Sequence, residues 1–456
     1  MLQDVSKQND EKMQAISIRI PPPGPKAKKV IEEDRTYLVK STKSIPIVAR
    51  RGYGSFVEDV DGNVYLDFST GISVNNLGHI HPKVYDAVSS QLTRLWHFAG
   101  TDFYYQEQVD AARSLTEVTP GRFRKKVFFS NSGTEANEAS IKIAKAATGK
   151  QQFISFIGGF HGRSQGSLSL TASKAIQRKG FFPSMPGVEH APFPNPYRNA
   201  FGIDGYENPD ELENRVLDYI ENYMIRTYVP QDNLAAFVVE PVQGEGGYIV
   251  PPKNFHRRLR KLADDLGVLV IVDEVQTGFG RTGKFFASEH FGVEPEIMSL
   301  AKAIAAGIPM GASVVHERLD FPEQSLHSNT FGGNPLASAA CVATINTIRS
   351  EHLLENATEM GKYFRKRLDE LYEKYECIGD VRGLGLMLAV DFVKDRKTRE
   401  PDSKLRDRVE MRSFETGLIL LSTGLSAIRI IPPLNVTRRE IDMGVDVLDK
   451  AIKSSL

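Results

Sequence analysis

Cysteine is almost absent from the sequence. The 456 residues include two cysteines, Cys341 and Cys377, which lie far apart and form no Cys-x-x-Cys pair. Two isolated cysteines exclude a disulfide framework and a cysteine-based zinc site. This scarcity is typical of a reducing compartment, and we expect a cytoplasmic protein that holds no metal.

An excess of charge of either sign is also missing. The chain carries 57 basic and 57 acidic side chains, and it has no basic run interleaved with aromatic residues. Proteins whose main task is to bind nucleic acid need a strongly basic surface. The balance of charges therefore predicts that nucleic acid is not a partner.

Long apolar runs are missing as well. The longest ones, such as LGVLVIV at 266–272, have the length of a strand and fall far short of a bilayer span. The first fourteen residues, MLQDVSKQNDEKMQ, mix both charges and have no apolar centre. They resemble neither a secretory signal nor a transit peptide, and we expect no membrane partner.

What the chain does have is a long alternation of strand and helix patterns. Short apolar segments predict strands at 126–129, 153–156, 235–239, 268–272, 297–300 and 311–315. Helical patterns lie near 134–147, 209–225 and 253–266. Such an alternation predicts an α/β fold with a mainly parallel sheet sandwiched by helices.

The segments before and after this alternation predict a different order of helices and strands. YGSFVEDVDGNVYLDF at 53–68 alternates around Asp61-Gly62 and predicts a hairpin. Helices are expected at 82–95 and 105–118, one long helix at 335–375, strands at 386–392 and 428–433, and helices at 403–416 and 437–453. We predict an N-terminal segment (1–75) that joins a small α+β domain (336–456), and a large domain between them (76–335).

Chemically distinctive side chains follow five of the predicted strands. Ligands of an open parallel sheet bind beyond the carboxyl ends of its strands, so these side chains are expected to share one edge. In chain order they are Gly133 and Thr134, then Phe160, His161 and Arg163, then Glu240 and Glu245, then Asp273 and Gln276, and finally Lys302. Five such strand ends together predict a functional site.

The residue types fit one chemistry. Glycine and hydroxyls at a helix N-terminus offer free N–H groups to a phosphate. Asp273 can pair with a protonated ring nitrogen, as the pyridinium of pyridoxal phosphate requires, and Phe160 can stack on that ring. Lys302 lies among alanines and aliphatics, where desolvation frees an amine for imine formation. Each residue alone also fits a plain cap, a core ring or a solvated lysine, but the combination favours a cofactor site.

Three other motifs point elsewhere and are weaker. GFGRTG at 278–283 has the glycine spacing of a dinucleotide site, but its acidic residues precede the glycines instead of following them. GRSQG at 162–166 matches a nucleophile elbow around Ser164, but Gly158 to Gly162 intervene, and no clean helix is expected after it. The histidines of HIHP at 79–82 precede a proline at a helix start and are expected to cap or pack.

With these residues in view, the chain resembles the class III aminotransferases, pyridoxal-phosphate enzymes of fold type I. The likeness runs from GSFVEDVDGNVYLDF to RIIPPL, through SNSGTEANEASIKIA, FHGRS, EPVQGEGG, VDEVQTGFGRTG, LAKAIAAGIPMGA and NTFGGNP. The most specific feature is DEVQTGFGRTG with a lysine 29 positions after its aspartate. The family includes 4-aminobutyrate, acetylornithine and ornithine aminotransferases and related archaeal amino-acid racemases.

The resemblance implies roles for these residues. Lys302 would be the Schiff-base lysine, Asp273 would pair with the ring nitrogen, and Gln276 would approach the ring hydroxyl. The implied cofactor-binding set is Gly133, Thr134, Phe160, His161, Glu240, Asp273, Gln276, Lys302 and Thr330. Thr330 would come from the other subunit, because the family forms its site at a dimer interface; a homodimer or a dimer of dimers is implied.

Four residues bear on the substrate by the same likeness. Arg429 would hold the α-carboxylate of glutamate or 2-oxoglutarate, and Glu245 would neutralise Arg429 when the donor has no carboxylate there. Arg163 would take the distal carboxylate with its planar fork. Ile72 matches the isoleucine of 4-aminobutyrate enzymes, whereas Phe160 departs from their usual tyrosine.

The function expected from the sequence is transfer of an amino group from an ω-amino acid to 2-oxoglutarate. Several alternatives stay open at this point. A racemase on the same cofactor would need a base on each face of Cα, and an ornithine or acetylornithine aminotransferase would differ in its donor. A non-catalytic protein that kept the fold, or a serine hydrolase using Ser164, would bind no such cofactor.

Overall fold

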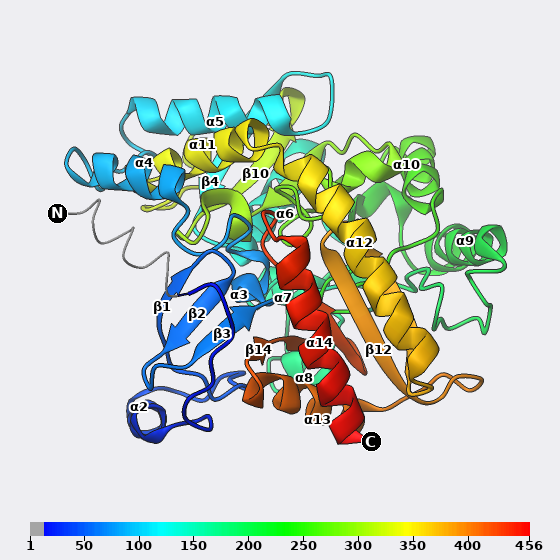
Figure 1. Cartoon of the computed structure of the whole chain (residues 1–456). Coiled ribbons are helices and arrows are strands. Elements are labelled where there is room, and N and C mark those ends of the chain that lie inside the picture. Colours follow the sequence, from blue (N-terminus) through cyan, green and yellow to red (C-terminus); the bar gives the residue numbers. More distant parts are fainter. Residues whose placement is uncertain (1–12) are drawn as a thin grey trace.

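A seven-stranded sheet forms the centre of the molecule. The computed structural model describes residues 13–456, so nearly all of the segment examined for a leader lies outside the described residues (Figure 1). The strand order is β4-β10-β9-β8-β7-β5-β6. The strands are β4 (Lys125–Ser130), β5 (Gln152–Phe156), β6 (Val188–Ala191), β7 (Leu234–Val239), β8 (Leu269–Asp273), β9 (Ile297–Leu300) and β10 (Gly311–His316). All six predicted strands are confirmed, and β6 was not predicted.

The direction of the strands brings the predicted site residues to one edge. Strands β5 to β9 pair in parallel, whereas β10 is antiparallel to both β9 and β4. Strand β4 therefore points the same way as the parallel set. The mainly parallel α/β sheet is confirmed, and the carboxyl ends of β4, β5, β7, β8 and β9 lie at the same edge.

Helices cover both faces of this sheet because its strands are apolar on both sides. Neighbouring residues of β7 show this: Val238 packs in a cluster with Ile141, and Phe237 packs in a separate cluster with Leu259. Every residue of β7 is buried, as expected for a central parallel strand. The covering helices are α6 (Gly133–Thr148) on one face and α9 (Pro209–Asp218) and α10 (Phe255–Leu266) on the other. A π-helical turn, Tyr219–Ile225, continues α9.

Three further helices lie together beside the β4 end of the sheet (Figure 1). They are α4 (Pro82–Leu92), α5 (Gln106–Val118) and α11 (Pro335–Ser350). The single helix predicted at 335–375 is wrong, because α11 ends at Ser350 and α12 (Leu353–Lys374) begins after two intervening residues. His352 lies between them with φ 53°, a left-handed conformation that interrupts a right-handed helix.

The C-terminal part builds a second, antiparallel sheet. Its strands are β11 (Ile378–Leu384), β12 (Met387–Asp395), β16 (Ala427–Ile430) and β15 (Leu421–Thr423), with β13 (Glu400–Pro401) beside β12. Helices α13 (Ser403–Glu415) and α14 (Arg438–Ser455) follow, and α14 lies alongside α12 (Figure 1). The strands predicted at 386–392 and 428–433 and both predicted helices are confirmed.

The N-terminal segment is tied directly to this C-terminal part. It contains α2 (Pro25–Tyr37), β1 (Ala49–Tyr53), β2 (Phe56–Asp59) and β3 (Val64–Asp67), and β2 and β3 form the predicted hairpin. Strand β14 (Leu418–Ile419) pairs in parallel with β3, and the Phe68 and Phe364 rings meet edge to face at 5.5 Å. The division at 75 and 335 stays a prediction.

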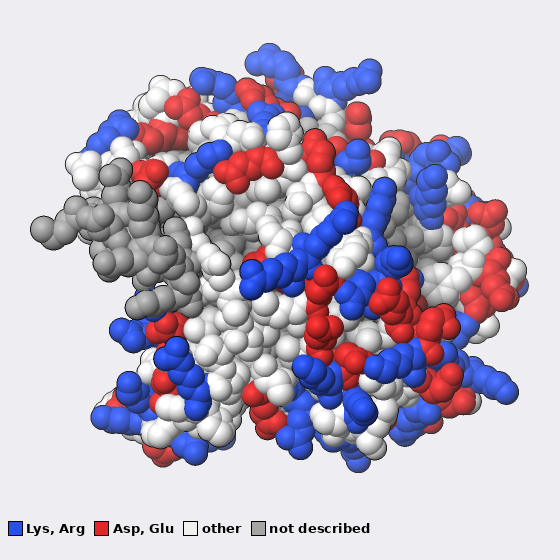
Figure 2. Space-filling model, in the orientation of Figure 1, with Lys and Arg blue, Asp and Glu red and all other residues white. Residues whose placement is uncertain are grey.

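The surface carries both signs of charge. Lysine and arginine side chains alternate with aspartate and glutamate over the face shown in Figure 2. Across residues 13–456, no helix joins the length and the apolar character that crossing a bilayer requires.

Candidate active site

One cavity of about 490 Å³ opens at the carboxyl edge of the central sheet. Ten of the thirteen candidate residues line it: Gly133, Thr134, Phe160, His161, Arg163, Glu240, Glu245, Asp273, Gln276 and Lys302. These residues come from five different strand ends separated by up to 169 positions in the chain. The parallel sheet alone explains why they meet.

Lys302 stands two residues after β9 and begins a 3₁₀ turn, Lys302–Ala305. Its backbone has φ 51°, a strained left-handed conformation of the kind found at functional sites. Ala301, Ala303 and Ile304 around it are buried, although part of the lysine side chain still faces the open cavity. Burial lowers the pKa of Lys302 to about 8, against the attraction of Asp273. A neutral amine is therefore accessible near physiological pH.

Asp273 ends β8 and is fixed by three donors. Its Oδ2 accepts a hydrogen bond from Asn137 Nδ2 at 2.8 Å and one from His161 Nδ1 at 2.8 Å, and its Oδ1 accepts from Val275 N at 3.0 Å. Burial alone would lower the pKa of His161, but the hydrogen bond to Asp273 and its charge raise it. This arrangement keeps a buried, oriented carboxylate at the end of the strand.

Glu240 ties two of the site loops together. Its Oε1 accepts from Phe160 N and its Oε2 from Gly244 N, each at 2.8 Å. Burial, reinforced by the charge of Asp273, raises the pKa of Glu240 to about 7 despite the neighbouring His161. Glu240 thus positions the loop that carries Phe160 and the loop that carries Glu245.

The start of α6 forms a small polar cradle. Gly133 is its first residue, and a Cβ there would lie 2.8 Å from Val275 Cγ1, so no larger side chain fits without displacement. The Thr134 hydroxyl contacts Ser164 Oγ at 2.6 Å and also Ser167 Oγ. Free N–H groups at a helix start, flanked by hydroxyls, suit a phosphate.

Glu245 connects the cavity to two cations. Its Oε2 accepts from Arg429 Nη2 at 2.8 Å, and its Oε1 from Lys174 Nζ at 2.6 Å. Burial would raise the pKa of Glu245, but Arg429 and Lys174 outweigh it and hold that pKa below its ordinary value. Arg163 is exposed at the cavity, with its guanidinium 5.7 Å from the centre of the Phe160 ring.

Three candidate residues do not line the cavity of their own chain. Arg429 lies behind Glu245 and is 5% exposed. Thr330 is exposed, and Ile72 is 38% exposed. Ile72 belongs to the short turn α3 (Thr70–Ser73), whose four residues all have positive φ, between 44° and 66°. Val74, just after this turn, does reach the cavity.

The GFGRTG and HIHP motifs prove to be structural. Arg281 of GFGRTG is fully buried and donates to the carbonyls of Leu386 and Pro432, so this stretch joins the large sheet to the C-terminal part. His79 contacts Asp67 at 2.9 Å, and His81 contacts Glu351 at 3.2 Å.

GRSQG also serves structure, although one expectation about it is wrong. A short helix, α7 (Gln165–Leu170), does follow Ser164 directly. The Ser164 hydroxyl donates to Glu138 Oε1 at 2.6 Å and contacts Thr134 and Ser167. Ser164 therefore supports the cradle around Thr134, and within residues 13–456 no histidine is bonded to its hydroxyl.

Sequence reasoning missed two site residues. Asn137 holds Asp273 and also donates to the His161 carbonyl at 2.7 Å, while its own Oδ1 has no hydrogen-bond partner among the described residues. Its position four residues after Gly133, on the same face of α6, was a usable signal. Lys174 gave no signal, because it joins Glu245 across 71 residues and follows none of the sheet strands directly.

Known proteins share this fold. Residues 37–452 match the family described as Aminotransferase class-III. The chain is 42% identical over 450 residues to an alanine/serine racemase of Pyrococcus horikoshii, covering 97% of this chain and 94% of the relative. It is 38% identical over 413 residues to a 4-aminobutyrate aminotransferase of Mycobacterium leprae, covering 90% and 91%. A PLP-bound amine transaminase from an uncultivated Pseudomonas species matches with a TM-score of 0.85 at 31% identity, over 92% of this chain and 98% of that one.

The chain belongs to the class III aminotransferase family, and its fold is that of the fold type I pyridoxal-phosphate enzymes. Pyridoxal 5'-phosphate is accordingly its cofactor. The donors and acceptors of the cavity fit this group: a helix start for the phosphate, a buried carboxylate for the ring nitrogen, and an amine whose pKa lies near 8.

Proposed function

We propose that the protein transfers the amino group of an ω-amino acid, 4-aminobutyrate or a similar donor, to 2-oxoglutarate. The observation that carries this proposal is the ion pair between Glu245 and Arg429 at the cavity. With its charge matched by Glu245, Arg429 tolerates a donor that has no carboxylate at that end. Once the Glu245 side chain rotates away, the Arg429 guanidinium can bind the α-carboxylate of the acceptor through two parallel hydrogen bonds.

The residues at the cavity divide the remaining work. When bound, pyridoxal phosphate would supply the electron sink that acidifies the C–H bond of the carbon bearing the amino group, and would carry that group between the two substrates. Gly133 and Thr134, with Thr330 of a second copy, would hold its phosphate, Phe160 would pack on its ring, and Asp273 would keep its nitrogen protonated. Lys302 takes the proton of the carbon that bears the amino group onto Nζ and returns it, as suits an amine whose pKa lies near 8.

Other residues at the cavity bind the substrate or support the residues that hold the cofactor. Arg163, exposed at the cavity, binds the distal carboxylate, which both 4-aminobutyrate and 2-oxoglutarate possess. His161 and Glu240 hold Asp273 and the Phe160 loop. Gln276, whose Nε2 donates to Tyr248 Oη at 2.9 Å, would approach the ring hydroxyl. Ile72 supports the 4-aminobutyrate assignment only through family likeness.

A second candidate is an amino-acid racemase on the same cofactor. It is favoured by the 42% identity to a protein named alanine/serine racemase. Racemisation needs proton transfer on both faces of Cα, and Lys302 accounts for one of them. It consumes no oxo acid, so the two candidates differ in their stoichiometry.

A donor panel separates these candidates. Purified enzyme is incubated with 4-aminobutyrate, ornithine, acetylornithine, leucine or alanine, with and without 2-oxoglutarate. The formation of glutamate and the optical activity of each chiral donor are measured. The proposal expects glutamate from 4-aminobutyrate only when 2-oxoglutarate is present. If alanine or leucine loses its optical activity without any oxo acid, the racemase replaces the proposed function. If glutamate forms with ornithine or acetylornithine but not with 4-aminobutyrate, the reaction stays a transamination and the proposed donor is wrong.

We further propose that the protein acts as a homodimer or a dimer of dimers, in a reducing compartment such as the cytoplasm. Thr330 lies beside an exposed aromatic patch formed by Trp96, Phe103, Tyr104 and Phe331, which are 65%, 50%, 99% and 59% exposed. The His97 and Phe331 rings lie 4.9 Å apart, so the two segments that carry the patch are adjacent. Such a cluster of exposed rings is typical of a subunit interface.

Sedimentation tests the assembly. The wild type is expected at twice the 50.7 kDa chain mass or more, and Trp96→Ser combined with Phe331→Ser is expected to shift it toward the single chain and weaken cofactor binding. A wild type that sediments as one chain with full cofactor affinity would contradict the shared site.

A further inference from the structure

Glu245 is clamped between cations from two different parts of the fold. Lys174 precedes the short helix α8 (Ala175–Arg178), on the large-sheet side, and reaches Oε1 at 2.6 Å. Arg429 stands on β16 of the C-terminal sheet and reaches Oε2 at 2.8 Å. Each carboxylate oxygen therefore has its own cation. The proposed function uses Glu245 and Arg429 but gives Lys174 no task.

The backbone that carries Glu245 is held from the C-terminal sheet. Gly424 N donates to the Glu245 carbonyl at 3.0 Å, and Thr423 Oγ1 donates to the Gly244 carbonyl at 2.9 Å. Arg382 Nε donates to the Gly247 carbonyl at 2.8 Å. With its loop held at these three carbonyls, Glu245 is expected to change partner by rotating its side chain.

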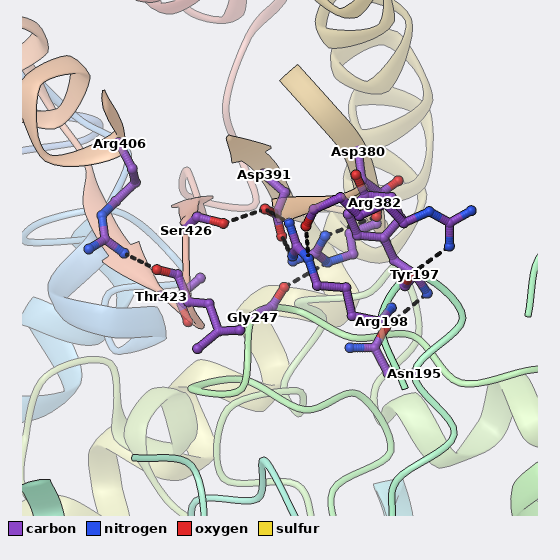
Figure 3. A network of polar contacts seen from close by, with 12 residues as sticks. Asn195, Tyr197, Arg198, Gly247, Asp380, Arg382, Asp391, Arg406, Thr423 and Ser426 are labelled. Atoms are coloured by element: carbon purple, nitrogen blue, oxygen red, sulfur yellow. Dashed lines mark hydrogen bonds and ion pairs between the residues drawn. The ribbon is translucent and has the colours of Figure 1, made fainter. Parts of the chain in front are cut away.

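Arg382 itself belongs to a buried ionic network (Figure 3). It pairs with Asp380 at 2.9 Å and with Asp391 at 2.8 Å, and Asp391 also accepts from Arg198 at 3.0 Å and from Ser426 at 2.7 Å. The Asp391 side chain is 2% exposed. A network this enclosed gives the Glu245 loop a rigid support.

The exchange of substrates poses a charge problem at Glu245. To free Arg429 for an α-carboxylate, Glu245 must give up that cation, yet its side chain is 19% exposed and the carboxylate would be left in a poorly solvated place. An uncompensated buried charge is strongly unfavourable. A second cation already bonded to the other oxygen removes this cost, because one ion pair persists while the other is exchanged.

We propose that Lys174 is a specificity-determining positioning residue that retains Glu245 when Arg429 is released to the substrate's α-carboxylate. This inference rests on the proposed use of Arg429 for α-carboxylates. Lys174 matters for ligands that need Arg429, such as 2-oxoglutarate. It matters little for 4-aminobutyrate, with which Glu245 stays on Arg429.

The variants are chosen to isolate this role. Lys174→Met removes the cation and keeps most of the side-chain volume, and Lys174→Arg is the conservative rescue. Lys179→Met is the matched control, because Lys179 is an exposed lysine at the other end of α8. Glu245→Gln, alone and with Lys174→Met, completes a double-mutant cycle.

Two readouts are made on the holoenzyme. Calorimetry measures binding of glutarate, a non-reactive dicarboxylate with the chain length of 2-oxoglutarate, and steady-state kinetics gives KM for 2-oxoglutarate and for 4-aminobutyrate. Lys174→Met is expected to weaken glutarate binding and raise the 2-oxoglutarate KM by about tenfold, less than for a fully buried charge pair because the Lys174 side chain is 34% exposed. The 4-aminobutyrate KM should stay within about twofold, as for a charge outside the donor's contacts.

The outcomes separate the two claims. Lys174→Arg and Lys179→Met should behave as wild type, and Lys174→Met should have no further effect in the Glu245→Gln background. Equal effects on donor and acceptor, or no effect on glutarate while Arg429→Met abolishes its binding, would overturn the role of Lys174 alone. If Arg429→Met leaves the affinity for glutarate unchanged, both the proposed function and this inference are overturned.

Discussion

Replacing Lys302 with methionine should stabilise the cofactor-free protein at neutral pH. The lysine is partly buried, and this burial lowers its pKa from 10.5 to about 8. At pH 7 the native state must therefore keep a poorly solvated ammonium group that water solvates fully in the unfolded chain. Methionine has a similar length and no charge, so it fills the same space without that cost.

The size of the effect follows from the shift in pKa. At 1.36 kcal/mol for each tenfold change in proton affinity, the difference between 10.5 and about 8 corresponds to about 3 kcal/mol. Part of the side chain faces the open cavity, where water screens the charge, so we expect about 2 kcal/mol. This is a large gain against the usual total stability of a protein.

The sign of the pH dependence is fixed by the same shift. Below pH 8 both native and unfolded chains are protonated at Lys302, and the cost is fully present. Between about 8 and 10.5 the native chain loses the proton first, so wild-type stability rises with pH. The advantage of Lys302→Met is therefore expected to be full at pH 7 and to fade as the pH rises through this window.

Urea unfolding of both apoproteins at pH 7, 9 and 10 measures the difference. Lys253→Met, at an exposed lysine, is the control and is expected to leave stability within about 0.5 kcal/mol at every pH. Lys302→Met that is equal to or less stable than wild type at pH 7, or an advantage that does not change up to pH 10, would refute the reasoning.

Three further predictions concern other parts of the site and core. Asp273→Asn should lower turnover by at least about a hundredfold and drop the pKa of His161 below its ordinary value, as followed by steady-state kinetics and NMR titration. Gly133→Ala should weaken cofactor binding by roughly tenfold, and Val275→Ala in the same chain should restore part of it, as measured by equilibrium dialysis. Phe364→Ala should destabilise the protein by about 3–5 kcal/mol in urea, because it empties a fully buried ring site at the junction of the N- and C-terminal parts.

Much of the central sheet could be predicted because each of its main strands is a short apolar segment that is recognisable from the local sequence. LAAFVV and LVIV are apolar throughout, as buried parallel strands must be, and each is followed at once by a charged residue of the site, Glu240 or Asp273. The order of those residues along the chain was enough to place Asp273, Glu240 and Lys302 at one edge.

The failures arose where tertiary contacts override local pattern. The helical periodicity of 335–375 continues across His352, yet the chain turns there into a left-handed conformation. β6 pairs with β5 through VEHA, whose single buried residue gives no strand signal. Likewise, no spacing rule connects Lys174 to Glu245, because the two meet only after α8 and the loop following β7 are packed together.

The central claim is that Lys302 carries the cofactor. Borohydride reduction of the holoenzyme, followed by mass spectrometry of its peptides, tests it most directly. We predict that the reduced cofactor is found on Lys302 and on no other residue, and that Lys302→Ala abolishes both the label and turnover. A label on another lysine, or a Lys302→Ala enzyme that turns over at the wild-type rate, would contradict the account.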